Sequence, residues 1–222
     1  MRSPHETPAF AGVTVVVGNR TLVIETATAA CSVALIEGPD VIARAHEVVG
    51  RGHAERLVSM IADLPGGGRA DRVLVDCGPG SFTGIRVGLA AALGLSLGWQ
   101  AELAGFSSLA IVAAAGIAQR GAALAVVLEG GHGEVFMQAY SSMLVPLAPL
   151  VSLKPADAVA AIGGLPAIGN GVRHLIAVDP SIDTVDTLPD AADAVLLPAR
   201  LRDLPPRPIY GRPPDAKPAS PR

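Results

Sequence analysis

The stretch over residues 78–88, GPGSFTGIRVG, has the residue types of a loop that binds an anion. It follows an apolar run, Val73–Val75, that predicts a strand, and it precedes a small-residue run that predicts a helix. The first backbone N–H groups of a helix lack partners within the helix, so they can donate hydrogen bonds to phosphate. The candidate residues for such a nucleotide or anion loop are Gly78, Gly80, Ser81, Thr83 and Arg86.

The same loop also has a purely structural explanation. Glycine permits a tight turn with positive φ and the close packing of a helix on a strand. Ser81 or Thr83 would then cap the helix, and Arg86 would pair with a carboxylate. A glycine loop with no further motif is weak evidence for nucleotide binding, so both interpretations stand at this point.

Metal binding and nucleophilic catalysis find little support in the residues. The five histidines form no HxxxH or HxxH pair, which is a common spacing for metal ligands on a helix. Ser81 lies in no GxSxG elbow. Cys31 and Cys77 lie in apolar runs, so we expect buried, inert thiols and a reducing, cytoplasmic location.

Composition narrows the function classes further. Half of the 222 residues are hydrophobic, aromatic residues make up 3% and the net charge is −3. The chain therefore lacks the strongly basic face that direct nucleic-acid binding needs. No apolar stretch reaches the roughly 20 residues of a membrane span. Residues 1–20 differ in pattern from the rest of the chain, and we expect a non-native or disordered extension there.

The elements expected around the glycine loop alternate between strands and helices. Strands are predicted over 21–26, 31–36, 41–49 and 73–77, the first three as a β-meander, and an amphipathic helix over 53–64. In the later half we expect helices over 107–118, 155–162 and 191–204 and strands over 122–128, 135–140 and 167–169. This order indicates an α/β protein with mixed sheets.

The helix after the loop carries small residues at intervals of four. Gly84, Gly88 and Ala92 would form a stripe on one face and let another element approach closely. A glycine inside a helix costs up to about 1 kcal/mol relative to alanine, so tight packing has to compensate. The stripe either packs inside the monomer or forms a helix–helix interface with a partner.

Five segments carry a family resemblance when they are taken in chain order. They are TLVIETATAACSVALI at 21–36, HAE at 53–55, the glycine loop, GFSSL at 105–109 and GEVF at 133–136. Together they closely resemble the bacterial TsaB (YeaZ) family, the dimerization subunit of the tRNA threonylcarbamoyladenosine complex. The resemblance extends to PIYGR at 208–212 and is looser in the second half.

The resemblance implies an actin-like ATPase fold of the ribonuclease H-like kind. Two related subdomains with mixed sheets are expected, the second one reduced. The predicted division is an extension over 1–20, a first subdomain with the partner-binding helices over 21–104, a second over 105–204 and a proline-rich tail over 205–222.

The resemblance also implies a non-catalytic role. A TsaB-type subunit dimerises with and supports its catalytic paralogue, TsaD, in forming threonylcarbamoyladenosine in tRNA next to the anticodon. The other expected partners are a TsaE-like ATPase and, for the chain alone, a second copy that forms a homodimer. Contact with tRNA is expected only through the complex, and no contact with a membrane is expected. No catalytic residue, metal or cofactor of its own is implied, although ATP or ADP could lie at the partner interface.

The same resemblance favours the interface interpretation of the glycine stripe. The predicted partner interface combines two helices, and its residues are His53, Leu57, Met60, Ile61, Gly84, Gly88 and Ala92. The alternative function, from a different class, is a small actin-like ATPase or kinase that uses the glycine loop and acts on its own.

The turn over residues 25–28, ETAT, bears on that alternative. In active actin-like kinases an acidic residue after the first strand helps to hold the metal–phosphate group, and hydroxyl groups such as those of Thr26 and Thr28 contact phosphate. The family usually has Asp where this chain has Glu25, and the longer side chain suits Mg²⁺ geometry poorly. The structural alternative is a turn capped by threonine hydroxyl groups.

This chain differs from the catalytic paralogue at the paralogue's metal site, and it differs from the family pattern in the loop before Gly133. The paralogue carries an HxxxH pair after the glycine-loop helix, where this chain has Ser108 and Val112. Apolar Val112 cannot bind a metal, which argues against independent transferase activity. The family also tends to carry arginines before Gly133, where this chain has Gly131 and His132.

Overall fold

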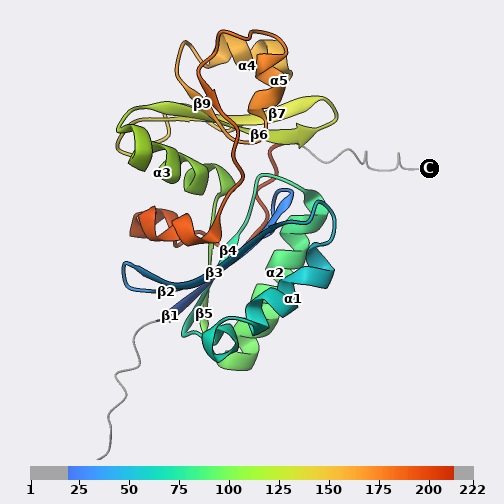
Figure 1. The fold of residues 1–222 in the computed structure, drawn as a ribbon, viewed down its shortest axis with the longest axis vertical. Helices are drawn as coiled ribbons and strands as arrows, with labels where there is room; N and C mark the ends of the chain where they lie inside the picture. The colour runs from blue at the N-terminus through green and yellow to red at the C-terminus, as the bar shows by residue number, and fades with distance from the viewer. Residues whose placement is uncertain (1–19, 213–222) are drawn as a thin grey trace, which may run out of the picture.

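Two five-stranded sheets lie one above the other along the long axis of the molecule (Figure 1). The computed structural model describes residues 20–212. The predicted extension over 1–20 lies outside the described residues except for Arg20, which begins the first strand, and the tail over 205–222 is described only as far as Arg212.

The first sheet has the order β3-β2-β1-β4-β5. Its strands are β1 (Arg20–Glu25), β2 (Ala30–Glu37), β3 (Asp40–Val48), β4 (Arg72–Asp76) and β5 (Glu102–Phe106). The first three form the expected antiparallel meander, whereas β4 and β5 run parallel to β1. The predicted mixed sheet is therefore confirmed.

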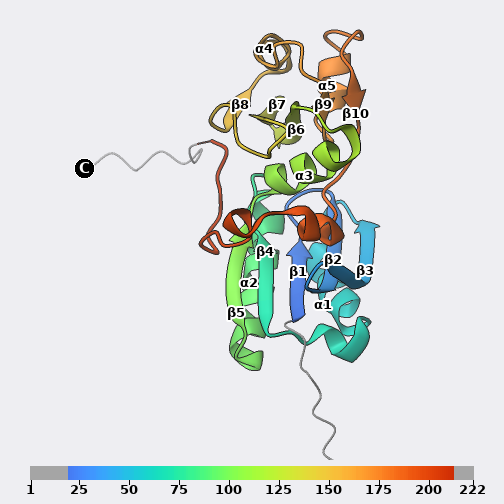
Figure 2. The same ribbon diagram turned by 90° about the vertical axis from the view of Figure 1, so that its left-hand side faces the viewer.

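Helices α1 (His53–Ala62) and α2 (Phe82–Trp99) cover one face of this sheet, and η1 (Pro65–Gly68) follows α1. Figure 2 shows both α helices behind the sheet, with two short red helices in front of it. The glycine stripe of α2 faces inward: a Cβ atom on Gly84 would collide with the Thr26 carbonyl oxygen, and one on Gly88 with the Thr26 hydroxyl group. The stripe therefore packs inside the monomer.

The second sheet has the order β10-β9-β6-β7-β8 and is smaller. The long hairpin of β6 (Leu124–Gly131) and β7 (Glu134–Tyr140) is joined by three strands of two or three residues. These strands are β8 (Val151–Leu153), β9 (Ala167–Ile168) and β10 (Thr184–Val185), and the accompanying helices are α3 (Ser108–Arg120), α4 (Pro155–Ala161) and α5 (Val172–Ile176). The expected reduced second subdomain matches this arrangement.

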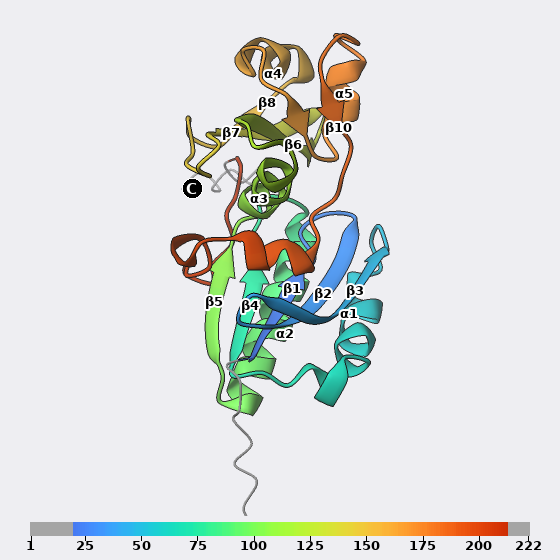
Figure 3. The same ribbon diagram turned by 60° about the vertical axis from the view of Figure 1, so that its left-hand side comes forward.

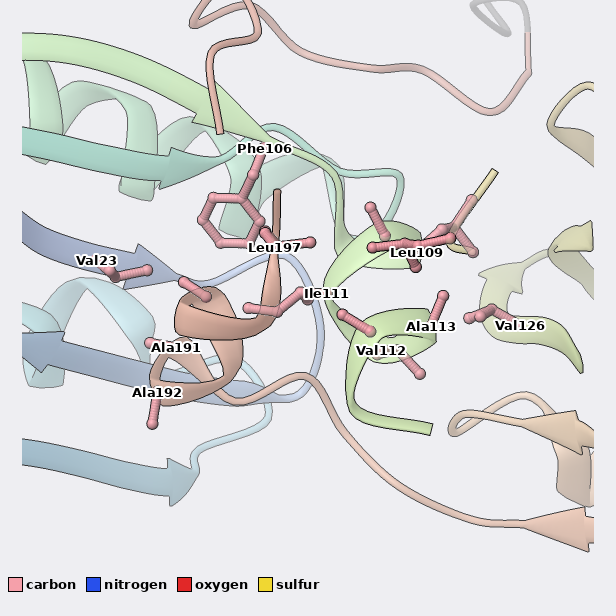
Figure 4. Packing of buried hydrophobic residues seen from close by; sticks show 14 of the residues in the cluster. Val23, Phe106, Leu109, Ile111, Val112, Ala113, Val126, Ala191, Ala192 and Leu197 are labelled. Atoms are coloured by element: carbon pink, nitrogen blue, oxygen red, sulfur yellow. The ribbon is translucent and has the colours of Figure 1, made fainter. Parts of the chain in front are cut away.

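The largest hydrophobic cluster lies between the two sheets. Figure 4 shows Ile111 and Val112 of α3 and Phe106 of β5 packed near Leu197 and Ala191, with Val126 of the second sheet on the other side. All six side chains are buried. The two subdomains therefore share one apolar core.

The chain returns to the first sheet near its end, through η2 (Ala191–Leu196) and η3 (Ala199–Leu201). The single helix predicted over 191–204 is wrong: Pro198 lacks a backbone N–H and separates two short 3₁₀ helices. The predicted boundary after residue 104 falls inside β5, and η2 of the predicted second subdomain packs on β1 and β2.

Helix α2 also bears on the predicted lack of a membrane span. Among residues 20–212 it is the one helix that is long and apolar enough to cross a bilayer, with 18 residues, of which 28% are buried. Its buried face packs on β1 and β4. Moving α2 into lipid would expose the first sheet, so we interpret α2 as a helix that packs on this sheet rather than as a membrane span.

The glycine contacts of α2 give a stability prediction. We expect Gly84→Ala to lower the free energy of unfolding by about 1–3 kcal/mol, because the added Cβ displaces the backbone at Thr26. Gly94→Ala, on the exposed side of α2 with no atom within 4 Å of the added Cβ, should raise it by up to about 1 kcal/mol. Urea unfolding followed by circular dichroism measures both, and equal stability of the two variants would contradict the packing role.

Candidate functional site

Two carboxyl groups are buried side by side at the carboxyl ends of β1 and β4. Glu25 and Asp76 are each 0% exposed. Ile24 lies opposite Val75 in the parallel pairing of the two strands, so the next residue of each strand is one of the two acids. Glu25 was a candidate from its place in the sequence, but Asp76 was missed. The signal that could have found it is an acid that ends an apolar strand directly before the glycine loop.

Each carboxyl group has one bonded oxygen and one without a partner. Glu25 Oε1 accepts from the Ala27 N–H at 2.7 Å. Asp76 Oδ1 accepts from the Gly78 N–H at 2.6 Å and from the Ser108 hydroxyl group at 2.8 Å. Glu25 Oε2 and Asp76 Oδ2 are buried with no hydrogen-bond partner among the described residues. Burial of an ionised oxygen in this state is costly, which favours protonation.

The electrostatics of the pair follow from burial and from like charge. Burial raises the pKa of Asp76 to about 7, against the opposing hydrogen bonds from Gly78 and Ser108. Burial, and next the negative charge of Asp76, raise the pKa of Glu25 well above its usual range. Two neighbouring carboxylates in a dry site cannot both ionise at low cost. Burial and like charge therefore both favour a pair that shares a proton over two ionised carboxylates.

The glycine loop uses its polar groups on the protein itself. The Ser81 N–H donates to the Ala27 carbonyl oxygen at 2.6 Å, and the Ser81 hydroxyl group caps α2 by accepting from the Gly84 N–H at 3.2 Å. A Cβ atom on Gly80 would collide with the Ala27 carbonyl oxygen. These contacts favour the structural explanation of the loop, in which glycines allow close backbone approach and serine is the cap. Thr83 is exposed at the start of the same helix.

The threonines of the neighbouring turn are engaged in the same way. The Thr26 hydroxyl group donates to the Gly84 carbonyl oxygen at 2.8 Å. The Thr28 hydroxyl oxygen accepts from the Ala30 N–H at 3.2 Å. Both side chains are buried, so they fix the turn to α2 and β2 rather than point toward solvent.

The end of the described chain lies across the glycine loop. The Ile209 N–H donates to the Cys77 carbonyl oxygen at 2.7 Å. The Tyr210 ring stacks on Phe82 with centroids 5.9 Å apart, and the Arg86 guanidinium lies 3.6 Å from the Phe82 ring centroid. Arg86 pairs with no carboxylate among residues 20–212, so that part of its prediction is wrong: its contacts are aromatic.

The two positions where the catalytic paralogue carries its HxxxH pair, Ser108 and Val112, have structural contacts in this chain. Ser108 donates to Asp76, and Val112 is 2% exposed within the core between the sheets (Figure 4). Both positions are thus used by the fold. Among residues 20–212, no group of three or more His, Cys, Asp or Glu residues could hold a metal ion.

The two thiols are buried near the two carboxyl groups, and burial disfavours their thiolate forms. Cys31 and Cys77 are both free and buried, as expected. Burial raises the pKa of Cys31 to about 11 and that of Cys77 to about 12. The reactive thiolate form is therefore scarce.

The predicted interface residues lie on the inner sides of α1 and α2. His53, Leu57, Met60, Ile61, Gly84, Gly88 and Ala92 are all buried within the monomer. The His53 ring N–H donates to the Ala30 carbonyl oxygen at 2.9 Å, and Leu57 belongs to the core cluster under the helices. As a partner surface this set is wrong, because a partner could reach these side chains only if the helices left the sheet.

The opposite sides of the two helices expose apolar side chains instead. Val58 of α1 is 67% exposed, and Leu93 and Leu97 of α2 are 51% and 72% exposed. Ala54 and Ala62 lie one turn before and after Val58, and Ala90 and Gly94 accompany the two leucines, all exposed. We call these seven residues the outer helix face.

Comparisons with known proteins point to the biosynthesis of threonylcarbamoyladenosine in tRNA. A family model described as "TsaD: tRNA N6-adenosine threonylcarbamoyltransferase" matches residues 45–145. The Escherichia coli protein named tRNA threonylcarbamoyladenosine biosynthesis protein TsaB is 37% identical over 128 residues, which is 54% of each chain. That match spans about half of the relative. An uncharacterized Mycobacterium tuberculosis protein is 30% identical over 208 residues, 89% of this chain and 93% of that protein.

A solved structure confirms the predicted fold class. YeaZ from Pseudomonas aeruginosa superposes with a TM-score of 0.74 at 26% identity, covering 86% of this chain and 99% of that one. The two mixed sheets with their helices are thus shared over nearly the whole described chain.

The buried carboxyl pair gives a pH prediction. The folded state holds a proton on Asp76 up to a pKa of about 7, whereas the unfolded chain releases it near pH 4. This contribution to stability is fully present below pH 4 and is lost as the pH rises through 7, at about 1.4 kcal/mol per pH unit for one proton. We expect Asp76→Asn to flatten the dependence between pH 4.5 and 7.

Urea unfolding at half-unit pH steps measures this difference, with Asp157→Asn on the exposed side of α4 as the matched control. The control should keep the slope of the original protein. Parallel profiles for Asp76→Asn and the original protein would show that the pair does not share a proton.

Proposed function

Because the chain belongs to the TsaB (YeaZ) family, we propose that it acts in the biosynthesis of threonylcarbamoyladenosine in tRNA, as a non-catalytic subunit that binds and supports a TsaD-like catalytic paralogue. The observation that carries this proposal is the outer helix face, an exposed apolar surface inside the segment that the TsaD family model matches. The family resemblance indicates the reaction, and the outer helix face is the surface through which we expect the paralogue to bind.

The paralogue is a suitable occupant of this surface because it shares the elements that build it. The TsaD model matches residues 45–145, which include all of α1 and α2. Two related subunits that carry equivalent helices can pair through them about a two-fold or pseudo-two-fold axis. The same face would let two copies of this chain pair when the paralogue is absent.

The composition of the outer helix face suits helix–helix packing. Ala54, Ala62, Ala90 and Gly94 are small, which allows close approach of a second helix pair, while Leu93, Leu97 and Val58 supply apolar area. Each of the larger side chains is at least half exposed in the isolated chain. Covering such groups contributes about 25 cal/mol per Å² of buried apolar surface.

The non-catalytic role is supported by the state of the glycine-loop site. The loop's hydroxyl and amide groups bind the protein's own oxygens, and Val112 stands in the apolar core. We therefore place substrate chemistry in the paralogue. A TsaE-like ATPase, ATP or ADP at the partner interface, tRNA contacts made through the complex and a cytoplasmic location remain part of the proposal.

The interface can be tested with charged substitutions on the outer helix face. We expect Val58→Glu and Leu97→Glu each to weaken binding to the TsaD-like paralogue at least 100-fold, because a carboxylate would be buried in an apolar contact. Val178→Glu, at a 49% exposed site in the second subdomain, should bind as the original chain does. Titration calorimetry and co-elution on size exclusion measure this, and unchanged binding by both helix variants would refute the interface.

The non-catalytic role can be tested with Glu25→Gln. The amide keeps the size of the side chain and removes its acid–base and metal-binding chemistry. We expect threonylcarbamoyladenosine formation by the reconstituted complex to stay within twofold of that with the original chain. A loss of 100-fold or more, with folding and paralogue binding intact, would instead place a catalytic group in this subunit.

A further inference from the structure

A cavity of about 420 Å³ lies at the amino ends of β1 and β4, between the first sheet and the short helices η2 and η3. Figure 3 shows these red helices crossing the face of the sheet. Thr21 and Arg72 line the cavity near the starts of their strands, whereas Glu25 and Asp76 lie at the opposite ends. The cavity is thus separate from the carboxyl pair and from the outer helix face.

The cavity exists because the helical segment that covers this face of the first sheet is interrupted. Pro198 separates η2 from η3, so Val195 and Ala199 line the space from two short helices rather than one continuous helix. Its volume lies within the range of about 300–1,000 Å³ that small-molecule sites occupy.

The lining carries positive charge and contains no acidic residue of its own. Of its nine residues, two are arginines, Arg72 and Arg202, and none is acidic, although the chain as a whole has a net charge of −3. The ion-pair partners of Arg72, Glu102 at 3.8 Å and Asp203 at 3.2 Å, are 61% and 72% exposed and lie outside the lining. Their attraction is weakened by solvent.

Arg72 also lacks one hydrogen-bond acceptor. Its Nη2 group donates to the Arg202 carbonyl oxygen at 2.6 Å, which fixes the side chain. Its Nε–H group is buried and has no partner among the described residues. The Arg202 guanidinium makes no hydrogen bond or ion pair with any residue in 20–212. An oxyanion bound in the cavity would supply acceptors for these donors.

The remaining wall is apolar. Ile36 and Leu74 are almost fully buried beneath the cavity, and Val195 adds a branched side chain from η2. A purely polar anion such as inorganic phosphate would leave the exposed part of this wall, the half-buried Val195 side chain, in contact with water. A ligand with a hydrocarbon part would cover it.

We propose that this cavity is a binding site for a small organic carboxylate, whose oxygens pair with Arg72 and Arg202 and whose hydrocarbon part lies on Ile36, Leu74 and Val195. A planar carboxylate matches the geometry of a guanidinium group. The site does not depend on the proposed role in tRNA modification, and its failure would leave that role untouched.

The test is titration calorimetry of the full chain with sodium butanoate, hexanoate and octanoate, and with inorganic phosphate. We expect saturable binding that tightens about threefold to fourfold for each added methylene, with phosphate at least tenfold weaker than hexanoate. No saturable binding of any carboxylate up to 20 mM, or phosphate binding as tight as hexanoate binding, would overturn the proposal.

Substitutions assign the binding to the cavity. Arg202→Gln should weaken hexanoate binding tenfold or more, and it removes no hydrogen bond or ion pair among residues 20–212 because that guanidinium makes none. Arg72→Gln should act likewise, with its folding checked by circular dichroism because Arg72 holds the Arg202 backbone. Arg207→Gln, an exposed arginine outside the lining, removes the same charge and should change binding less than twofold. Equal loss in Arg207→Gln and Arg202→Gln would overturn the site.

Discussion

The contact between the glycine loop and the turn over residues 26–27 determines how the rest of the first subdomain is built. Gly80 and Gly84 lie against the Ala27 and Thr26 carbonyl oxygens so closely that no Cβ atom fits. This approach draws α2 down onto β1, with the Thr26 hydroxyl group bonded to the Gly84 carbonyl oxygen. Because this contact sets the rotation of α2 about its axis, it determines which residues of α2 face the sheet and which face outward.

The same contact explains why an anion-loop sequence does not leave an open anion site. Where the loop backbone packs on a neighbouring turn, its amide groups find acceptors there, as the Ser81 N–H does in Ala27. The carboxyl groups of Glu25 and Asp76 are buried beside this contact, and burial raises the pKa of both groups. The glycines thus serve structure, and the residual polar chemistry of the site is internal.

The sequence predicted the elements with strong periodicity and missed those that depend on their neighbours. The meander, α1, α2 and the β6–β7 hairpin have long apolar patterns and were found. The strand β5 begins with Glu102 and contains Gly105, and β10 has two residues, so their own residues say little. The final helix was wrong because the apolar pattern was followed through Pro198.

The candidate site was predicted in part, for a related reason. Apolar periodicity marks the side of a helix that is buried, but it does not tell whether a sheet or a partner covers that side. Leu57 and Gly88 were therefore assigned to a partner when they pack on the sheet. Asp76 was missed because its importance comes from Glu25, which is distant in the chain and adjacent only once β1 and β4 pair.

The return of the chain end to the first sheet constrains how the protein is made. Leu204 exchanges backbone hydrogen bonds with Gly105 of β5, and Ser32 of β2 accepts from the Ala191 N–H. A ribosome delivers residues 191–204 only after the whole second sheet has been synthesised. One face of the first sheet therefore stays incompletely covered until the second sheet has been synthesised. Contacts between residues this far apart in the sequence slow folding, and the uncovered apolar face favours binding of chaperones during synthesis.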